Sequence, residues 1–358
     1  MLPELEYYRG KRVFITGHTG FKGSWLCALL LYAGAELTGF SLEPPTEPNL
    51  FTLAGLKSRM RSIRGDVREY DLLRRAFDEA QPEFVFHLAA QPLVRESYRR
   101  PRETYEVNVM GTVNLMECVR LCPSVRSVVN VTTDKVYLNR ERPSGYREDE
   151  PLDGFDPYSN SKSCSELVTH SDVNSFFSAG DAPAVSTVRA GNVIGGGDFA
   201  ADRLIPDCLR AAAAGQPVVL RNPASVRPFQ HVLDALWAYL LIARAQAEAP
   251  AAAGSYNVGP EDADCLTAGE LAEKFCRCWG EGAAWLHRGE ASAPHEAALL
   301  RLNCEKLKNT LGWRPRWGID QAIEMTCRFG KVWLSGGSIP SEMEAEITAF
   351  LNGGEADA

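Results

Sequence analysis

Residues Arg12–Gly23 read RVFITGHTGFKG, and this stretch decides the fold. Its first five residues form a short β-branched run, which is typical of a buried parallel strand. Glycines follow at positions 17, 20 and 23, and Ser24–Ala33 then carries apolar residues at helical spacing. A glycine-rich turn between strand and helix lets the backbone approach a pyrophosphate, which the helix N-terminus stabilises. The stretch therefore predicts the first βαβ unit of a dinucleotide-binding domain.

The alternation of strand and helix continues outward from this unit. Helices are expected near Thr104–Arg120 and from Tyr158 onward, and further elements are expected at Glu36–Ser41, Arg61–Arg64, Tyr70–Ala80, Phe84–Leu88, Ser127–Thr132 and Ala184–Arg189. This order implies right-handed crossovers and an α/β fold with a Rossmann-type, doubly wound parallel sheet. After residue 190 the elements become shorter and glycines cluster at 195–197. We expect a nucleotide-binding domain at 1–190 and a smaller mixed α/β lobe at 191–358, and we leave open a return of the chain to the first domain.

Composition limits the partners. The chain has 358 residues with 38 basic and 46 acidic side chains, a net charge of −8, which argues against nucleic-acid and anionic-membrane binding. A few local arginines still suffice to hold an anionic small molecule. The ten cysteines include no Cys-x-x-Cys pair, so we expect reduced thiols, no metal site and a cytoplasmic location. The apolar run Leu26–Tyr32 is too short to span a bilayer.

The residues at the end of the second strand bear on cofactor choice. The acid nearest to that end is Glu43, and no arginine follows at once to hold the 2′-phosphate of NADP. His18 and Lys22 are cations within the glycine turn and are expected to face this region. The pattern favours NAD over NADP. Asp66, followed by Val67, is expected to border the adenine pocket, and its alternative role is an N-cap of the next helix.

Tyr158 and Lys162 are four residues apart and share one face of a predicted helix. A neighbouring ammonium stabilises a phenolate, so Lys162 is expected to lower the pKa of Tyr158 toward neutrality and make it a base. Thr132, Thr133 and Asp134 follow the fourth expected sheet strand, at the carboxyl edge where α/β proteins bind ligands. We expect these polar groups to face a substrate, although they would also suit a turn.

Two further positions complete the expected cofactor site. His87 closes a strand and is expected to be structural, whereas the small residues after it, Leu88-Ala89-Ala90, leave room for a cofactor. Asn108 is expected to bend its helix or to support the tyrosine. The candidate cofactor-binding residues are Gly17, His18, Thr19, Gly20, Phe21, Lys22, Gly23, Asp66, Val67, Leu88, Ala89, Ala90, Asn108, Tyr158 and Lys162.

Together these residues resemble the extended short-chain dehydrogenase/reductases that act on nucleotide sugars, and among them the 4,6-dehydratases. The resemblance extends from Val13 to about Leu334. It is carried, in order, by ITGHTGFKGSW, HLAAQPLVRESY, NVMGTVNLME, TTDKVY, DPYSNSK, RAGNVIGGGDFAADRLIPD, RPFQHV, PHEA and LGWRPRWG. Dehydratases of the dTDP-glucose type carry Thr-Asp-Glu where this chain has Thr133-Asp134-Lys135, and that glutamate is the family's base for the C5 proton.

The resemblance implies an internal redox dehydration. Tyr158 would take the O4 proton as C4 is oxidised with NAD, Thr133 would bond O4, and Asp134 would protonate the departing C6 hydroxyl. Lys135 becomes the candidate for the C5 proton transfer, for which its amine must be neutral. The resemblance also implies a dimer or tetramer through the helix of Tyr158, and a nucleotide-sugar diphosphate held by the 191–358 lobe through Asn192, Arg203, Leu204, Arg227 and Arg301.

Three alternatives remain open at this point. A nucleotide-sugar 4-epimerase shares the Tyr/Lys pair and NAD but needs no acid–base pair for C5 and C6, so Asp134-Lys135 disfavours it. A cofactor-sensing binding protein would have no use for the Tyr/Lys pair. A 4,6-dehydratase acting on a different nucleotide hexose is a third possibility, because these residues do not identify a base.

Overall fold

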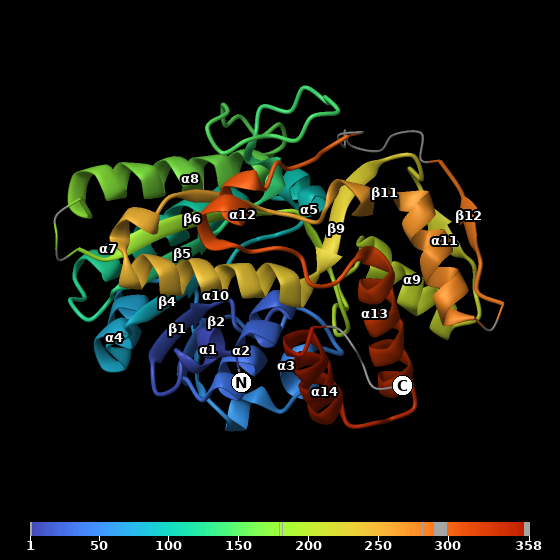
Figure 1. The fold of residues 1–358 in the computed structure, drawn as a ribbon, viewed down its shortest axis with the longest axis horizontal. Helices are drawn as coiled ribbons and strands as arrows, with labels where there is room; N and C mark the ends of the chain where they lie inside the picture. The colour runs from blue at the N-terminus through green and yellow to red at the C-terminus, as the bar shows by residue number, and fades with distance from the viewer. Residues whose placement is uncertain (1, 179, 181, 281, 290–298, 354–358) are drawn as a thin grey trace.

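The computed structural model describes residues 2–178, 180, 182–280, 282–289 and 299–353. Its main element is a seven-stranded sheet in which every neighbouring pair is parallel, with the order β10-β6-β5-β4-β1-β2-β3 (Figure 1). The strands are β1 (Arg12–Thr16), β2 (Glu36–Ser41), β3 (Arg61–Arg64), β4 (Phe84–His87), β5 (Ser127–Val131), β6 (Ala184–Ala190) and β10 (Ser255–Val258). The expected doubly wound parallel sheet is therefore confirmed.

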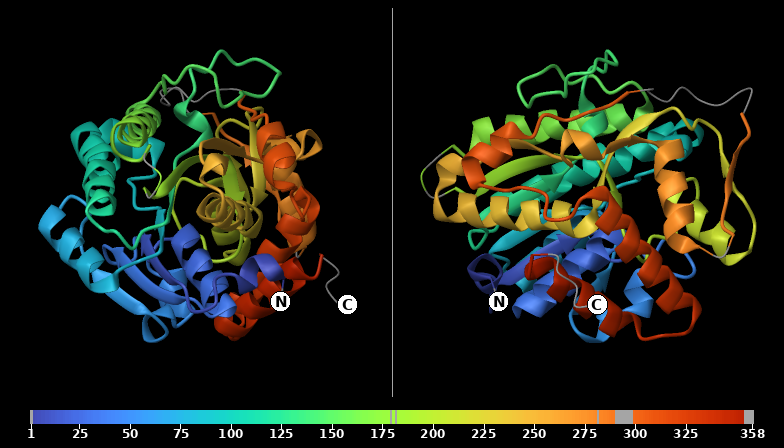
Figure 2. Two further views of the ribbon diagram at one scale, coloured as in Figure 1. Left: turned by 60° about the vertical axis from the view of Figure 1, so that its left-hand side comes forward. Right: turned by 45° about the vertical axis from the view of Figure 1, so that its right-hand side comes forward.

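Helices cover both faces of this sheet because successive side chains of its strands point to opposite sides. Val13 and Ile15 of β1 pack in the core beneath α2 (Phe21–Ala33) and α10 (Val232–Glu248), whereas Phe14 points to the opposite core. That opposite face is covered by α4 (Tyr70–Ala80), α7 (Gly111–Arg120) and α8 (Pro157–Phe176) (Figures 1 and 2). The strand order reverses between β4 and β1, and α/β proteins bind ligands at the carboxyl ends of the strands beside such a switch point.

A second, smaller part of the molecule lies beside the carboxyl edge of the sheet, on the right in Figure 1. It contains a three-stranded sheet with the order β11-β9-β7 and a two-stranded sheet of β12 and β8. Its own apolar core is distinct from the two cores of the main sheet. The elements are β7 (Asn192–Ile194), β8 (Val218–Leu220), β9 (Val226–His231), β11 (Cys265–Thr267), β12 (Trp285–His287), α9 (Leu204–Ala213), α11 (Ala268–Trp279) and α13 (Ile319–Leu334).

The chain returns to the main sheet after it has begun the second part. Helix α10 follows β9 directly, packs on β5 and β6, and leads to β10 at the edge of the main sheet. The remaining short helices are α1 (Pro3–Glu6), α3 (Leu50–Leu53), α5 (Val94–Arg99), α6 (Pro101–Tyr105), α12 (Glu305–Leu311) and α14 (Ile339–Leu351), with 3-10 turns at Leu56–Ser58, Asp134–Val136, Pro250–Ala252 and Asp262–Asp264. The expected assignment of one ligand to each part of the chain stays a prediction.

The helix expected near Thr104–Arg120 is confirmed, and it contains one irregular turn. A π-helical turn, Glu106–Met110, separates α6 from α7. At its centre the amide of Asn108 accepts from the backbone N–H of Gln91 at 2.8 Å and donates to its carbonyl at 3.1 Å. The Asn108 amide therefore pairs with a chain segment outside the helix, and such π turns recur at functional sites.

None of the helices in the described part of the chain is long and apolar enough to cross a membrane. Over the same residues there is no group of three or more His, Cys, Asp or Glu side chains that could hold a metal ion.

Candidate active site

A cleft of about 1160 Å³ lies at the carboxyl edge of the main sheet, between it and the second part of the molecule. Its walls include the glycine turn, the ends of β2, β4, β5 and β6, the start of α8, and residues of α9 and β9. Most small-molecule pockets enclose about 300–1,000 Å³, so this cleft has room for more than one ligand. Its lining extends from the end of β2, past the glycine turn and the start of α8, to α9 and β9.

The glycine turn presents bare backbone to the cleft. Gly17 has φ +75°, and a Cβ there would lie 2.7 Å from the backbone nitrogen of Ala89. A Cβ on Gly23 would lie 2.1 Å from the Gly17 carbonyl oxygen, so the turn and the start of α2 tolerate no side chain at either place. At Gly20 the nearest atom would be 3.5 Å away. The cradle therefore leaves open space in front of Gly20 and the α2 N–H groups, where a diphosphate fits.

His18 and Lys22 do not face the end of β2 as two cations, and that expectation is wrong. His18 is fully buried, its ring lies beneath Gly39, and its Nε2 is 2.7 Å from the Ser62 hydroxyl. Burial lowers the pKa of His18 to about 4. The ring therefore supports β2 and β3 as a neutral group and does not line the cleft.

Lys22 lines the cleft on the side of the catalytic candidates. Its Nζ donates to the Tyr239 hydroxyl at 3.3 Å and lies 5.7 Å from the centre of that ring. Burial lowers the pKa of Lys22 to about 7, and the neighbouring cations Arg203 and Lys162 lower it further. The Lys22 side chain extends toward α10 and α8, so its amine does not lie near the end of β2.

The end of β2 and the segment after β3 form the other end of the cleft. The Thr19 hydroxyl bonds the Ser41 hydroxyl at 2.8 Å, and the Glu43 carboxylate pairs with Arg64 at 2.9 Å. Asp66 lines the cleft with Val67, and its carboxylate accepts from the backbone N–H of Arg68 at 2.9 Å. The side-chain bond from Arg68 lowers the pKa of Asp66. Helix α4 begins at Tyr70 with Glu69 as its N-cap, so the alternative of Asp66 as N-cap is wrong.

Tyr158 and Lys162 lie one turn apart at the start of α8, where the sequence placed them. Asp156 caps this helix by accepting from the Ser159 N–H at 3.0 Å, and Pro157 occupies the first turn, where no N–H is needed. The Lys162 Nζ donates to the Val131 carbonyl at 3.0 Å, and the hydroxyls of Tyr158 and Thr133 are hydrogen-bonded. Both side chains are buried and reach the cleft.

The expected effect of Lys162 on the pKa of Tyr158 is wrong. Burial raises the pKa of Tyr158 above its usual value, and Lys135 is the largest opposing charge, followed by the hydrogen bond with the Thr133 hydroxyl. Burial also lowers the pKa of Lys162, to about 8, while Glu166 opposes that shift. The chain therefore holds Tyr158 as a phenol whose acidity depends first on the Lys135 ammonium, one turn beyond β5.

Asp134 and Lys135 form a pair at the end of β5. The buried Asp134 Oδ1 accepts from the Thr133 hydroxyl and from the Lys135 Nζ, both at 2.9 Å. Its second oxygen is buried with no hydrogen-bond partner among the described residues. The Lys135 side chain is 27 % exposed and lines the cleft with Thr132 and Thr133. The end of β5 thus brings an acid, an amine and two hydroxyls beside Tyr158.

His87 and Asn108 lie behind the cleft. His87 is buried between the hydroxyls of Thr16 and Thr112, at 2.7 and 3.3 Å, and burial lowers its pKa to about 3. Leu88, Ala89 and Ala90 line the cleft, as expected for the path of a cofactor. Asn108 donates to the Ser161 hydroxyl at 2.9 Å, and Ser161 bonds the Tyr158 carbonyl at 2.7 Å. Asn108 therefore supports α8 and does not itself line the cleft.

The candidate substrate residues divide into two groups. Asn192, Arg203, Leu204 and Arg227 line the cleft, and Arg203 pairs with Asp198 at 3.0 Å. Arg301 does not line it, although its buried Nε has no partner among the described residues. The PHEA motif at 294–297 lies outside the described residues. The cleft is also lined by Arg95 and Arg99 of α5 and by Arg140 and Arg221, which the sequence did not single out because isolated arginines carry no pattern.

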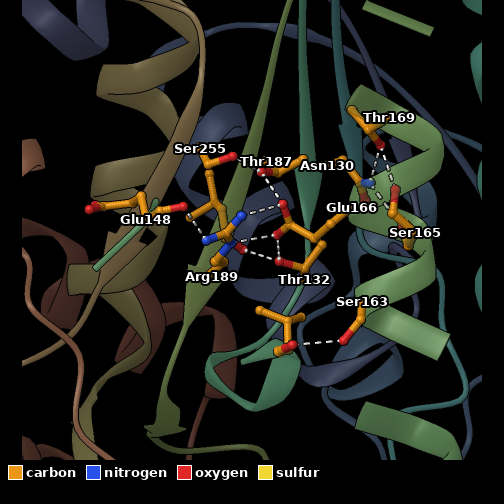
Figure 3. Close-up of polar contacts among 12 residues, drawn as sticks. Asn130, Thr132, Glu148, Ser163, Ser165, Glu166, Thr169, Thr187, Arg189 and Ser255 are labelled. Atoms are coloured by element: carbon orange, nitrogen blue, oxygen red, sulfur yellow. Dashed lines mark hydrogen bonds and ion pairs between the residues drawn. The ribbon is translucent and has the colours of Figure 1, made fainter. Parts of the chain in front are cut away.

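A second group missed by the sequence lies directly behind the catalytic candidates. Glu166 of α8 and Arg189 of β6 form a buried ion pair with the hydroxyls of Thr132 and Thr187 around it (Figure 3). The available signal was the spacing of Tyr158, Lys162 and Glu166, which repeats every four residues on one helical face.

A parallel sheet with this glycine turn, and a Tyr–Lys pair one helical turn apart beside the switch point, define an extended short-chain dehydrogenase/reductase. The family model for GDP-mannose 4,6 dehydratase matches residues 14–326. The chain belongs to this family of nucleotide-sugar 4,6-dehydratases.

Known relatives agree with this assignment. CDP-glucose 4,6-dehydratase of Salmonella typhimurium is 47 % identical over 351 residues, covering 97 % of this chain and 98 % of that protein. dTDP-glucose 4,6-dehydratase of Xanthomonas campestris is 27 % identical and covers 90 % of this chain and 94 % of its own. Among solved structures, UDP-glucose 4-epimerase of Thermus thermophilus in complex with NAD has a TM-score of 0.77 at 25 % identity, with 89 % of this chain and 99 % of that chain covered.

Proposed function

We propose that the protein is a hydro-lyase that converts CDP-D-glucose to CDP-4-dehydro-6-deoxy-D-glucose and water, with NAD as its resident cofactor. The observation that carries this proposal is the set Thr133, Lys135 and Tyr158 on one wall of the cleft, with the buried Asp134 carboxylate bonded to Thr133 and Lys135. The chain is also 47 % identical along nearly its whole length to a CDP-glucose 4,6-dehydratase. The assignment to cytidine rests on that relative.

The cleft suits NAD through its glycine turn and through the end of β2. The bare backbone at Gly20 and the uncapped N-terminus of α2 would hold the diphosphate, with Leu88, Ala89 and Ala90 along the path to α8. Glu43 places a carboxylate after β2, where it pairs with Arg64 at 2.9 Å, and an acid at this place would accept hydrogen bonds from the adenosine ribose hydroxyls of NAD. Bound NAD⁺ supplies a hydride acceptor for C4 of the sugar and, once reduced, a hydride donor for C6.

Tyr158 is the base for the first proton. Its hydroxyl bonds Thr133, so the two groups together would hold the sugar O4. Tyr158 acts as the base in its phenolate form, which the nearby positive charge of Lys135 stabilises. The phenolate accepts the O4 proton as C4 is oxidised to the ketone, and becomes the phenol that burial favours. The ketone then makes the C5 hydrogen acidic.

Asp134 and Lys135 carry the elimination. Transfer of one proton across their 2.9 Å contact converts a carboxylate and an ammonium into a carboxylic acid and a neutral amine. The amine of Lys135 takes the C5 proton, and the acid of Asp134 gives its proton to the C6 hydroxyl, which leaves as water. A single internal proton transfer therefore prepares both the acid and the base that elimination requires.

The second part of the molecule would hold the nucleotide. Asn192, Arg203, Leu204 and Arg227 lie along its side of the cleft, and guanidinium groups bind diphosphate oxygens in pairs.

The protein is further proposed to be a homodimer or homotetramer that works in the cytoplasm without nucleic acid or membrane. The outer surface of the α7–α8 layer carries exposed apolar side chains: Met110, Leu121, Leu167 and Phe176. An apolar face formed by two neighbouring helices suits a second copy of the chain, because the two-fold operation places the same helices opposite themselves.

Mass spectrometry of products formed from CDP-, UDP-, dTDP- and GDP-glucose tests the function. A product lighter by one water from CDP-glucose supports the proposal, whereas the same loss from another nucleotide reassigns the base. A product of unchanged mass indicates a 4-epimerase. Absence of turnover with every sugar would contradict the enzyme assignment.

A further inference from the structure

The Glu166–Arg189 pair is nearly inaccessible to solvent, with side chains 3 % and 4 % exposed. Arg189 donates from Nε to Glu166 Oε1 and from Nη2 to Oε2, both at 3.0 Å, which is the bidentate arrangement. The hydroxyls of Thr132 and Thr187 donate to the same two oxygens at 2.5 and 2.6 Å (Figure 3). Each carboxylate oxygen thus accepts two hydrogen bonds, which compensates the cost of burying the charge.

Three successive turns of α8 meet three successive residues at the end of β5. Tyr158 bonds the Thr133 hydroxyl, Lys162 donates to the Val131 carbonyl, and Glu166 accepts from the Thr132 hydroxyl. The third contact is the one that Arg189 anchors from β6. A shift of α8 along the sheet therefore has to break the Glu166 contacts before it can displace Tyr158 or Lys162.

We propose that the Glu166–Arg189 pair is a positioning element for the dehydratase reaction: it fixes α8 on the end of β5 and supplies the negative charge that keeps Lys162 an ammonium. This role rests on the proposed function, because it concerns the same Tyr158–Lys162 site. Neither residue lines the cleft, so both act through Lys162 and the end of β5.

Arg189 also connects the Glu166–Arg189 pair to the chain segment beyond Lys135. Its Nη1 donates to the Tyr137 hydroxyl and to the Glu148 carbonyl, both at 2.9 Å. Tyr137 in turn donates to Asn257 Oδ1 of β10 at 2.6 Å. The pair therefore ties α8, β6 and the segment that carries Asp134 and Lys135 into one buried network.

The charges around Lys162 come from several elements. Lys22 faces it from α2, His87 from β4 and Glu166 from its own helix, with Arg189 behind Glu166. Asp134 and Lys135, in the turn after β5, act on the neighbouring Lys22. Burial lowers the pKa of Lys162 to about 8, and Glu166 is the charge that opposes this shift. His87 is neutral at physiological pH because its pKa is about 3.

The sign of the expected pH effect follows from these charges. If turnover needs the Lys162 ammonium, activity falls at alkaline pH as this group loses its proton. Glu166→Gln removes the opposing carboxylate, so the pKa of Lys162 falls below about 8 and the alkaline limb moves to lower pH. A shift of one pH unit from about 8 would lower kcat at pH 8 about fivefold.

The experiment compares four variants with the wild-type protein across the neutral and alkaline range. Glu166→Gln leaves Arg189 unpaired, whereas Glu166→Gln/Arg189→Met removes both charges and so avoids a buried orphan charge. Glu166→Asp keeps the charge. Thr169→Val is the matched control, since it removes a buried hydrogen bond to Asn130 from the same face of α8 without altering any charge.

Three readouts separate positioning from mere folding. These are the pH profile of kcat with CDP-glucose, the pH dependence of Lys162 acetylation read by peptide mass spectrometry, and the thermal midpoint. We expect the double variant to regain much of the thermal stability that Glu166→Gln loses, while the alkaline limb of its kcat profile stays displaced to lower pH. Glu166→Asp should move this limb back toward the wild-type pH. Thr169→Val should lower the midpoint and keep the wild-type limb.

Two results would overturn the positioning role. One is a wild-type limb and a wild-type acetylation midpoint in the double variant, and the other is an equal displacement in Thr169→Val. If Glu166→Gln does not fold, the double variant decides. Because acetylation needs no substrate, a wild-type protein that leaves CDP-glucose unchanged would count against the proposed function alone, and the acetylation series would still judge the positioning role.

Discussion

Tyr158 shows what a single residue contributes to the cleft. Its phenol is buried and shares a hydrogen bond with Thr133, and the positive charge of Lys135 opposes the rise in its pKa that burial causes. Tyr158→Phe removes only the oxygen, so we expect kcat to fall by at least about a hundredfold, the lower end for loss of a general base. NAD affinity, measured by calorimetry, should stay close to the wild-type value. Retained turnover would exclude Tyr158 as the base.

Lys135 decides the second half of the proposed reaction. Lys135→Ala removes the amine that would take the C5 proton, so exchange of the C5 hydrogen with deuterated solvent should stop, as followed by mass spectrometry or NMR. The matched variant is Lys135→Glu, which restores the acidic base of related dehydratases and should retain exchange. Continued exchange in Lys135→Ala would assign the proton to another group.

The residues also show where sequence reasoning was sufficient. The Tyr158–Lys162 pair and the turn at Thr133 were predicted because helical spacing and strand ends are local properties. His18 was misjudged because its neutrality arises from Gly39 and Ser62, which belong to two other strands. The pair of Glu166 and Arg189 was missed for the same reason, since its partners lie on different elements.

Among the elements, the π turn at Glu106–Met110 has side-chain contacts whose contribution to the free energy of unfolding can be measured. Asn108→Ala would leave the N–H and C=O of Gln91 and the Ser161 hydroxyl without this partner. We expect a loss of about 2 kcal/mol in the free energy of unfolding, which is typical of buried groups left unsatisfied. Chemical denaturation measures it.

The control for this variant lies on the next helix. Glu117→Ala removes an exposed pair with Arg120 on α7, and such pairs contribute about 0–1 kcal/mol. An equal loss in both variants would show that the Asn108 contacts do not support the turn.

At the level of elements, the first six strands of the main sheet were predicted to within one residue, because most of them are short apolar runs. The short strands of the second part were not predicted. The π turn was not predicted. Apolar periodicity does not reveal it, because the turn depends on the contact of Asn108 with Gln91 and on the close approach of Gly111 to Val67.

For the whole molecule, the outer face of α8 bears on assembly. Leu167 is 56 % exposed there, and Leu167→Glu would place a charge within the apolar patch. We expect this variant to shift toward the monomer in analytical ultracentrifugation, because burying an unpaired carboxylate opposes association. Leu334→Glu, at a residue 45 % exposed at the end of α13, is the matched control and should sediment like the wild-type protein. If both variants sediment alike, α8 is not the interface.

The arrangement of the whole chain was the least predictable property. The sequence indicated shorter elements and clustered glycines after residue 190, but it carried no local signal that α10 and β10 rejoin the main sheet. The position of Arg301 likewise depends on its pairing with Tyr146, more than a hundred residues earlier.

The return of β10 to the edge of the main sheet has a consequence for synthesis on the ribosome. Until residues 232–258 have emerged, β6 is an open edge and one face of the sheet lacks α10. Open strand edges and uncovered apolar faces invite association with other chains. During synthesis the nascent protein therefore exposes a surface that a chaperone can bind. A chain truncated after residue 190 would keep this surface exposed.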